Sequence, residues 1–345
     1  MDLSTILTSP VSASVPCRID FGGTLDITTF NLPLAHLEPA SFNIALDMRT
    51  QVTLSAHTSG RVKISSRGFD TAEFDQGAAP FDHPMGLMFA CAQYFNLHGL
   101  HIHIESTSPP RSALGGSSSA AVAILAAICK ALDKEIDPLA LTWLAHYIES
   151  SVAGVPCGVQ DQAAAAFGGV NLWQWKMGRT GPEFDKFPIC ETKDEIDDLN
   201  RHILIAYCGI PHVSKNVNKQ WVDAFVQGSA RAHFENIAQI TKKFFKALKG
   251  KAYGTAADLM NQETRLRLEL TPDVLDKTGK KLFERAWQNQ CGARFTGAGG
   301  GGCVWAIGDS GQIQTLKNHW QEVLTPVNDA AILDTKIDPH GIKIL

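Results

Sequence analysis

Two patterns of hydrophobic and polar residues alternate along the first half of the chain. Short apolar runs and strict alternation predict strands, whereas apolar residues spaced three and four apart predict helices. The predicted strands cover residues 11–20, 44–56, 62–66, 100–106 and 168–175. The predicted helices cover residues 85–97, 120–132 and 138–152. This half of the chain is therefore expected to mix helices and strands in one domain.

The second half begins after a polar, acidic stretch at residues 191–200, which is the best candidate for a domain boundary. An apolar run at residues 202–208 follows, and long helical patterns lie between Lys215 and Leu270. The end of the chain predicts a helix, a glycine-rich turn, a strand, a helix and a strand; the predicted elements cover residues 279–290, 303–307, 312–323 and 331–337. This split order predicts a ferredoxin-like α+β domain. We therefore expect two domains, residues 1–195 and 196–345.

Composition narrows the range of partners. The 345 residues are 44% hydrophobic and 19% charged with a net charge of −4, and the basic residues are scattered, so neither nucleic acid nor a membrane surface is an expected partner. Residues 1–10 lack a basic targeting start, and no apolar run approaches the ~20 residues of a membrane span. Eight cysteines without a C-x-x-C pair argue against disulfides or structural zinc. We expect a reduced, cytoplasmic protein.

The most informative motif is PPRSALGGSSSAA, residues 109–121, which leads directly into a predicted helix. Glycines let the backbone approach a ligand, and a helix N-terminus carries about half a positive charge, so the motif is a candidate anion site. A nucleotide phosphate is the expected anion; a Gly/Ser linker is the alternative. The candidate nucleotide-binding residues are Pro110, Arg111, Ser112, Ala113, Leu114, Gly115, Gly116, Ser117, Ser118, Ser119 and Ala120.

Two common nucleotide motifs do not account for this site. The P-loop pattern is absent, because neither Gly250-Lys251 nor Gly279-Lys280 is followed by Ser or Thr. A G-x-G-x-x-G pattern at residues 297–302 leads into a predicted strand instead of a helix, which argues against a dinucleotide fold.

Three further motifs accompany the glycine–serine motif. They are CRIDFGGTLDITTF at residues 17–30, IESSVAGVPCGVQDQ at residues 148–162 and RFTGAGGGG at residues 294–302. In the second of them, Glu149 lies late on a predicted helix and Asp161 follows twelve positions later, across a Gly/Pro turn.

With these motifs in this order, the chain resembles the GHMP small-molecule kinases, which include galactokinase, homoserine kinase and mevalonate kinase. The segment GVPCGVQDQ is similar to galactokinases, and RIDFGGTLD is similar to L-fucokinases and D-glycero-D-manno-heptose 7-phosphate kinases. The segments MNQETRLRLELTP and GAGGGG are most similar to the heptose kinases. The resemblance implies an α+β two-domain GHMP kinase fold, with an N-terminal α/β domain of the ribosomal protein S5 domain 2-like type and a ferredoxin-like C-terminal domain. It also implies a kinase that uses ATP and Mg²⁺ to phosphorylate the anomeric hydroxyl of a sugar.

The resemblance assigns roles to charged residues. Asp161 would accept the proton of the attacking hydroxyl or orient that hydroxyl, and Arg18 would stabilise the developing charge. A purely structural ion pair is the alternative for these two residues. Ser119 and Glu149 would hold the magnesium ion, with Ser118 as the alternative to Ser119.

The residues expected to contact the substrate lie in all three motifs, and the turn at residues 297–302 would close the site from the second domain. Asp20 and Asp26 would accept hydrogen bonds from sugar hydroxyls, although Asp20 could instead cap the turn. The candidate substrate-binding residues are Asp20, Gly22, Gly23, Thr24, Asp26, Gly158, Gly299 and Gly300.

Several alternatives remain open at this point. The first motif lacks the Glu-His pair that galactokinases use at the sugar, which argues against galactose. Arg111 either contacts a phosphate or is a solvated loop residue, and Ala113, at a position that is often glycine, makes the loop stiffer. The acceptor is a sugar or a sugar phosphate, and the chain is a monomer or a homodimer. The competing functions are a mevalonate- or homoserine-type kinase and a catalytically silent regulator that binds ATP and sugar.

Overall fold

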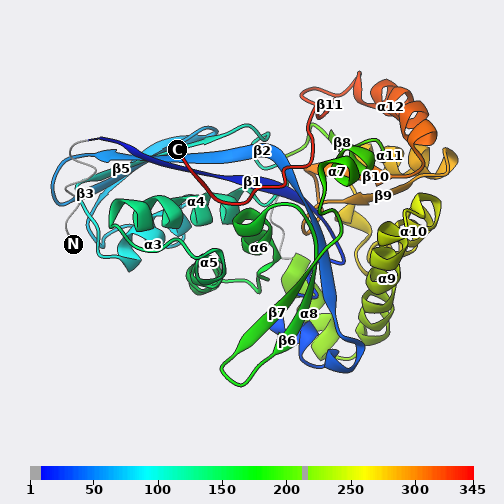
Figure 1. Cartoon of the computed structure of the whole chain (residues 1–345), viewed down its shortest axis with the longest axis horizontal. Coiled ribbons are helices and arrows are strands. Elements are labelled where there is room, and N and C mark those ends of the chain that lie inside the picture. Colours follow the sequence, from blue (N-terminus) through cyan, green and yellow to red (C-terminus); the bar gives the residue numbers. More distant parts are fainter. Residues whose placement is uncertain (1–8, 212–216) are drawn as a thin grey trace.

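The structure is a computed structural model that describes residues 9–211 and 217–345. Its strands form an eight-stranded and a four-stranded sheet, which lie at opposite ends of an elongated molecule (Figure 1). The prediction for residues 1–8, and the start of the helical pattern at Lys215, lie outside the described residues. Among the described helices, none combines the length and apolar character that crossing a membrane requires.

The larger sheet has the order β12-β1-β2-β5-β3-β4, and β6 pairs with both β2 and β7. Its strands are β1 (Val11–Phe21), β2 (Ala40–Ala56), β3 (Arg61–Ser66), β4 (Phe69–Asp75), β5 (Leu100–Ser106), β6 (Val170–Met177), β7 (Pro182–Pro188) and β12 (Lys343–Ile344). Helices on one face of this sheet cover its apolar side chains (Figure 1). They are α3 (Gly86–Tyr94), α4 (Gly116–Ala131), α5 (Pro138–Val152) and α6 (Gln160–Phe167).

Helix α4 is the centre of this layer. From Ser118 to Cys129 every residue of the helix is buried, and many of them are alanines, which permit close packing against the sheet and the neighbouring helices. This packing fixes the helix, and with it the position of the glycine–serine motif at its N-terminus.

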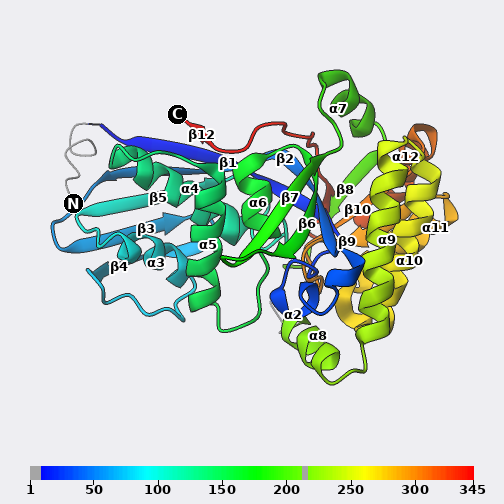
Figure 2. The ribbon, with the colours of Figure 1, turned by 60° about the horizontal axis from the view of Figure 1, so that its bottom comes forward.

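The smaller sheet has the order β11-β8-β10-β9, with antiparallel neighbours. Its strands are β8 (Ile203–Tyr207), β9 (Gly292–Phe295), β10 (Cys303–Ile307) and β11 (Ala331–Ile332), and its helices include α9 (Arg231–Lys249), α10 (Tyr253–Leu270), α11 (Lys277–Gln288) and α12 (Ser310–Leu324). This strand order is ferredoxin-like, as predicted. Figure 2 shows α9 and α10 side by side along the outer side of this part of the molecule.

The end of β1 lies where the two parts meet. Phe21 at the end of the strand stacks on Phe244 of α9, with 4.0 Å between ring centroids. The indole N–H of Trp305 on β10 donates to the backbone oxygen of Asp20 at 3.0 Å. Strand β1 therefore carries the RIDFGGTLD motif from the first sheet directly against the second.

The predicted elements and the observed ones differ in instructive places. The helix predicted from residue 120 begins at Gly116, and the strand predicted at 331–337 shortens to Ala331–Ile332. The acidic stretch contains the helix α7 (Lys193–Asn200), which begins with a capping box formed by Thr192 and Glu195. The proposed boundary between residues 195 and 196 thus falls inside α7, and β12 returns to pair with β1. The division into residues 1–195 and 196–345 stays a proposal.

Candidate active site

A cavity of about 820 Å³ lies where the N-termini of α4 and α6, the loop after β1 and residues 297–298 of the second domain come together. Most of the predicted nucleotide-binding residues line it: Pro110, Arg111, Ser112, Ala113, Gly115, Gly116, Ser117, Ser118 and Ala120. Arg18, Thr24, Asp26, Glu149, Gly158 and Asp161 also line it. Four sequence motifs that are far apart along the chain therefore share one cavity.

The glycine–serine motif forms the N-terminus of α4, and Gly115 at the N-cap has φ of 75°. Because Gly115 has no side chain, the N–H groups of the first turn have no side-chain cap and are available to an anion. The preceding loop is held by a hydrogen bond from the Arg18 backbone N–H to the Leu114 oxygen, at 3.1 Å. Arg111 and Ala113 adopt positive φ values of 55° and 61° in this loop. The loop is thus held in a strained conformation at the cavity wall.

Arg18 and Asp161 form a bidentate pair at the base of the cavity. The guanidinium donates to both Asp161 carboxylate oxygens at 2.7 Å and to the Ala113 backbone oxygen at 2.8 Å. The Arg18 side chain is 4% exposed, whereas that of Asp161 is 23% exposed and so remains open to a ligand. A Cβ at Gly115 would lie 3.3 Å from Asp161 Oδ2, which places the pair directly beside the α4 N-terminus.

Glu149, Ser118 and Gln162 form a polar cluster on the neighbouring wall. Glu149 Oε2 accepts hydrogen bonds from Ser118 Oγ at 2.7 Å and from the Gln162 side chain at 2.6 Å. Burial raises the pKa of Glu149 to about 7, although the bond from Ser118 lowers it.

The hard oxygens of Ser118 and Glu149 fit Mg²⁺, which takes one or two protein ligands together with phosphates and water. Among the described residues, no group of three or more His, Cys, Asp or Glu side chains could hold a metal alone. Ser119 faces away from this cluster and donates to the Pro16 oxygen at 3.2 Å. The geometry therefore replaces Ser119 with Ser118 as the proposed magnesium ligand.

Asp26 presents a carboxylate to the far end of the cavity. Its Oδ2 accepts a hydrogen bond from the Gln160 backbone N–H at 3.0 Å, whereas its buried Oδ1 has no hydrogen-bond partner among the described residues. Burial raises the pKa of Asp26 to about 6. Gly158 packs so closely that a Cβ there would lie 1.6 Å from Asp26 Oδ2. Asp26 Oδ1 is therefore an unsatisfied hydrogen-bond acceptor in the wall of the cavity.

Other predicted residues lie outside the cavity, because they pack against neighbouring elements. Asp20, predicted to contact the substrate, is fully buried and pairs with Arg294 at 3.0 Å, so it does not line the cavity. Gly22 packs on Thr241, and Gly299 packs on Val274. The remaining residues that do not line the cavity are Leu114, Ser119, Gly23 and Gly300. The glycine-rich turn reaches the cavity instead through Gly297 and Ala298.

Several residues of the site were not predicted from the sequence. Gln160 and Gln162 flank Asp161 in QDQ, and their spacing from Asp161 was the available signal for them. Phe69, Met85 and Met88 give the end of the cavity next to Arg111 an apolar wall, but nothing in the sequence pattern separated them from core residues.

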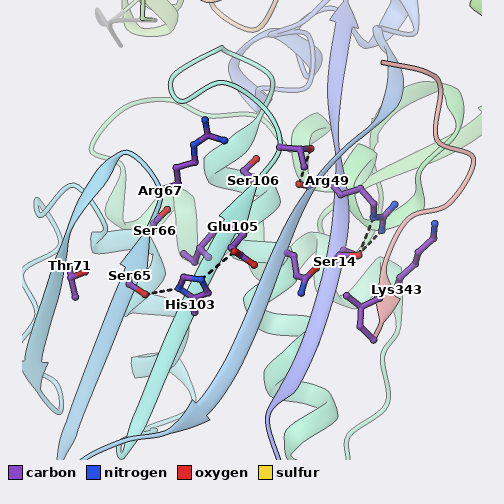
Figure 3. Close-up of a pocket in the computed structure, with 14 residues that line it drawn as sticks. Ser14, Arg49, Ser65, Ser66, Arg67, Thr71, His103, Glu105, Ser106 and Lys343 are labelled. Carbon is purple, nitrogen blue, oxygen red and sulfur yellow. Dashed lines mark hydrogen bonds and ion pairs between the residues drawn. The ribbon is translucent and has the colours of Figure 1, made fainter. Parts of the chain in front are cut away.

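A second cavity, of about 780 Å³, lies over strands of the larger sheet (Figure 3). Ser65 Oγ bridges the rings of His101 and His103, each at 2.8 Å, and Glu105 lies 3.6 Å from His103. It shares Ser66, Arg67, Ile104 and Ser106 with the first cavity but contains neither the α4 N-terminus nor the Arg18–Asp161 pair. The candidate nucleotide-binding site is therefore the first cavity.

The uncapped helix N-terminus, the Arg–Asp pair and the Ser–Glu cluster together define a small-molecule kinase. The family models agree with this geometry: "GHMP kinases N terminal domain" matches residues 84–169, and "GHMP kinases C terminal" matches residues 244–325. The chain belongs to the GHMP kinases, a family whose members use ATP.

Relatives within the family differ in substrate. A mevalonate kinase from Pyrococcus abyssi is 25% identical over 87% of this chain and 90% of its own. A D-glycero-alpha-D-manno-heptose 7-phosphate kinase from Campylobacter jejuni is 23% identical over 60% of this chain and 61% of its own. The solved Lactococcus lactis galactokinase with galactose has a TM-score of 0.75 at 17% identity, covering 98% and 95% of the two chains. The kinase class is thus established, and the acceptor is a matter for proposal.

Proposed function

We propose that this protein is an ATP-dependent kinase that phosphorylates a sugar hydroxyl, most simply the anomeric hydroxyl of a fucose-like or heptose 7-phosphate-like sugar. The observation that carries the proposal is the unpartnered Oδ1 of Asp26 in the cavity that also contains Asp161. A buried carboxylate oxygen without a partner is costly, and a ligand hydroxyl would satisfy it.

The two ends of the cavity differ in character. Phe69, Met85 and Met88 form an apolar wall that suits a nucleotide base, and we place the base there and the acceptor beside Asp26 and Gly158. In this arrangement the α4 N-terminus binds the phosphates between the two ends. The acceptor would therefore lie against Asp26.

Charge at the acceptor end favours a hydroxyl-rich molecule. Among the described residues it carries the carboxylates of Asp26 and Asp161, and its cation, Arg18, already donates to Asp161 and to the Ala113 oxygen. A carboxylate or phosphate of the acceptor would meet like charge beside these oxygens, whereas the hydroxyls of a sugar or sugar phosphate would donate to them.

The mechanism that we propose uses the side chains in place. Asp161 accepts the proton of the acceptor hydroxyl or orients that hydroxyl. Arg18 holds the Asp161 carboxylate in place, and the positive charge of Arg18 faces the transferring phosphoryl group. N–H groups of the α4 start bind phosphate oxygens. Ser118 and Glu149 would hold Mg²⁺, which, when bound, neutralises charge on the phosphates.

The comparisons favour mevalonate as a second candidate acceptor, because the relatives that match along most of the chain include mevalonate kinases.

The test is ADP release with Mg-ATP, measured against fucose, galactose, D-glycero-D-manno-heptose 7-phosphate, mevalonate and homoserine. Sugar-dependent turnover that Asp161→Asn lowers by about 10²-fold or more supports the proposal. Turnover on mevalonate or homoserine alone refutes the proposal that the acceptor is a sugar. ATP binding without turnover favours a silent regulator.

A further inference from the structure

Four fully buried charged residues form a chain of ion pairs behind the cavity. Asp20 pairs with Arg294 at 3.0 Å, Arg294 with Glu263 at 2.9 Å, and Glu263 with Arg267 at 2.8 Å. All four side chains are 0% exposed, and none of them lines the cavity. Burying charge is costly, and buried ion pairs add little net stability. The network therefore indicates a role other than stabilising the fold.

Arg267 is the member of this network that reaches the loop after β1. From α10 its guanidinium donates to the Gly23 backbone oxygen at 2.6 Å and to Thr24 Oγ1 at 3.1 Å. The same group lies 4.6 Å from the centroid of the Trp221 ring and is bound to Glu263 on its other side. With partners on every side, the guanidinium is held in one orientation.

The loop that Arg267 holds is strained at Thr24. Thr24 has φ of 76°, a conformation that a β-branched residue rarely adopts unless its surroundings impose it. The Thr24 oxygen accepts a hydrogen bond from the Ile27 N–H at 2.9 Å, which closes a turn around Asp26. Thr24 and Asp26 both line the cavity, so the conformation at Thr24 sets where the Asp26 carboxylate lies.

We propose that Arg267 is a positioning residue for the acceptor: from the second domain it imposes the strained turn at Thr24 and thereby places Asp26. Only the expected effect of Arg267 on catalysis rests on the proposed function. That Arg267 fixes the conformation of the loop after β1 is independent of which acceptor binds.

The first measurement is hydrogen–deuterium exchange of the full chain in three variants. Arg267→Met removes both bonds to the loop, and Thr24→Val removes only the hydroxyl that Arg267 contacts, leaving the ion pairs in place. Arg265→Met is the matched control, since Arg265 lies on the same helix but stacks on Trp287 at 3.8 Å. We expect faster exchange at residues 21–30 in the first two variants only. The proposal would be overturned if exchange at residues 21–30 were unchanged in Thr24→Val and also in Arg267→Met, provided that the second variant folds.

Kinetics then separate positioning from a merely structural role, with the acceptor that the wild type uses. We expect kcat/KM for the acceptor to fall about tenfold in Thr24→Val and about 10²-fold in Arg267→Met, because one and two charge-assisted hydrogen bonds to the loop are lost. The Kd for ATP, measured without acceptor, is expected to stay unchanged. Equal losses in ATP and acceptor binding would contradict positioning. If no acceptor in the panel is turned over, the proposed function fails. The exchange result still decides whether Arg267 fixes the conformation of the loop after β1.

Discussion

Replacing Gly158 with alanine probes the acceptor end of the cavity with a single methyl group. The backbone at Gly158 does not require glycine, because its φ is not positive, so the change adds volume without backbone strain. The new Cβ would lie 1.6 Å from Asp26 Oδ2 and 2.2 Å from Asp26 Cγ. The carboxylate must therefore move by roughly 2 Å to reach van der Waals distance.

That displacement breaks the hydrogen bond that orients Asp26. The Gln160 backbone N–H donates to Asp26 Oδ2 at 3.0 Å, and a shift of this size takes the oxygen out of range. A hydrogen bond to a charged group contributes about 1.5–3 kcal/mol, so kcat/KM for the acceptor should fall by about 10–10²-fold. The three atoms nearest to the new Cβ all belong to Asp26, and we expect ATP binding to persist.

The assay is steady-state ADP release with the acceptor varied, together with calorimetric titration of ATP. Gly311→Ala is the control, because a Cβ at Gly311 meets nothing within 4 Å and its φ is not positive. Wild-type kcat/KM in Gly158→Ala would refute the placement of Asp26 at the acceptor. A parallel loss of ATP affinity would show instead that the whole cavity had been disturbed.

Two further predictions concern the metal ligand and the pH dependence. Ser118→Ala should raise the Mg²⁺ concentration needed for half-maximal activity by about tenfold, whereas Ser119→Ala should not; equal effects in a magnesium titration would contradict the assignment of Ser118. Burial raises the pKa of Asp26 to about 6, and its ionised form accepts the acceptor hydroxyl. The reciprocal of the acceptor KM should therefore fall as pH drops through about 6. Asp26→Asn should abolish this inflection in the pH profile of 1/KM. An unchanged inflection in the variant would exclude Asp26 as its source.

The strand order of the smaller sheet and most central elements were predictable, because strong apolar periodicity marks buried strands and helices. Strand β4, with the sequence FDTAEFD, was not predicted, since its side chains are exposed or only partly buried. Helix α6 was not predicted, because four successive alanines after Gln162 carry no period of their own.

The choice between Ser118 and Ser119 depended on where α4 begins. A helix turns about 100° per residue, so the two hydroxyls point to different sides. The sequence predicted a start at residue 120, whereas the helix begins at Gly116, and the phase of the serine run could not be known without that start. The Asp20–Arg294 pair was equally hidden, since its partners lie 274 residues apart in sequence.

Loops from both halves of the molecule approach the Arg18–Asp161 pair, which explains why glycines recur around it. A Cβ at Gly115 would lie 3.5 Å from Arg18 Cζ, and a Cβ at Gly297 would lie 3.5 Å from Arg18 Nη2, so both loops approach the guanidinium closely. The Gly297 N–H also donates to Asp20 Oδ1 at 2.6 Å, which ties the second-domain loop to β1. The α4 N-terminus and the second domain thus meet on one arginine. Any change that moves the second domain relative to β1 should therefore alter phosphate binding and the Arg18–Asp161 pair together.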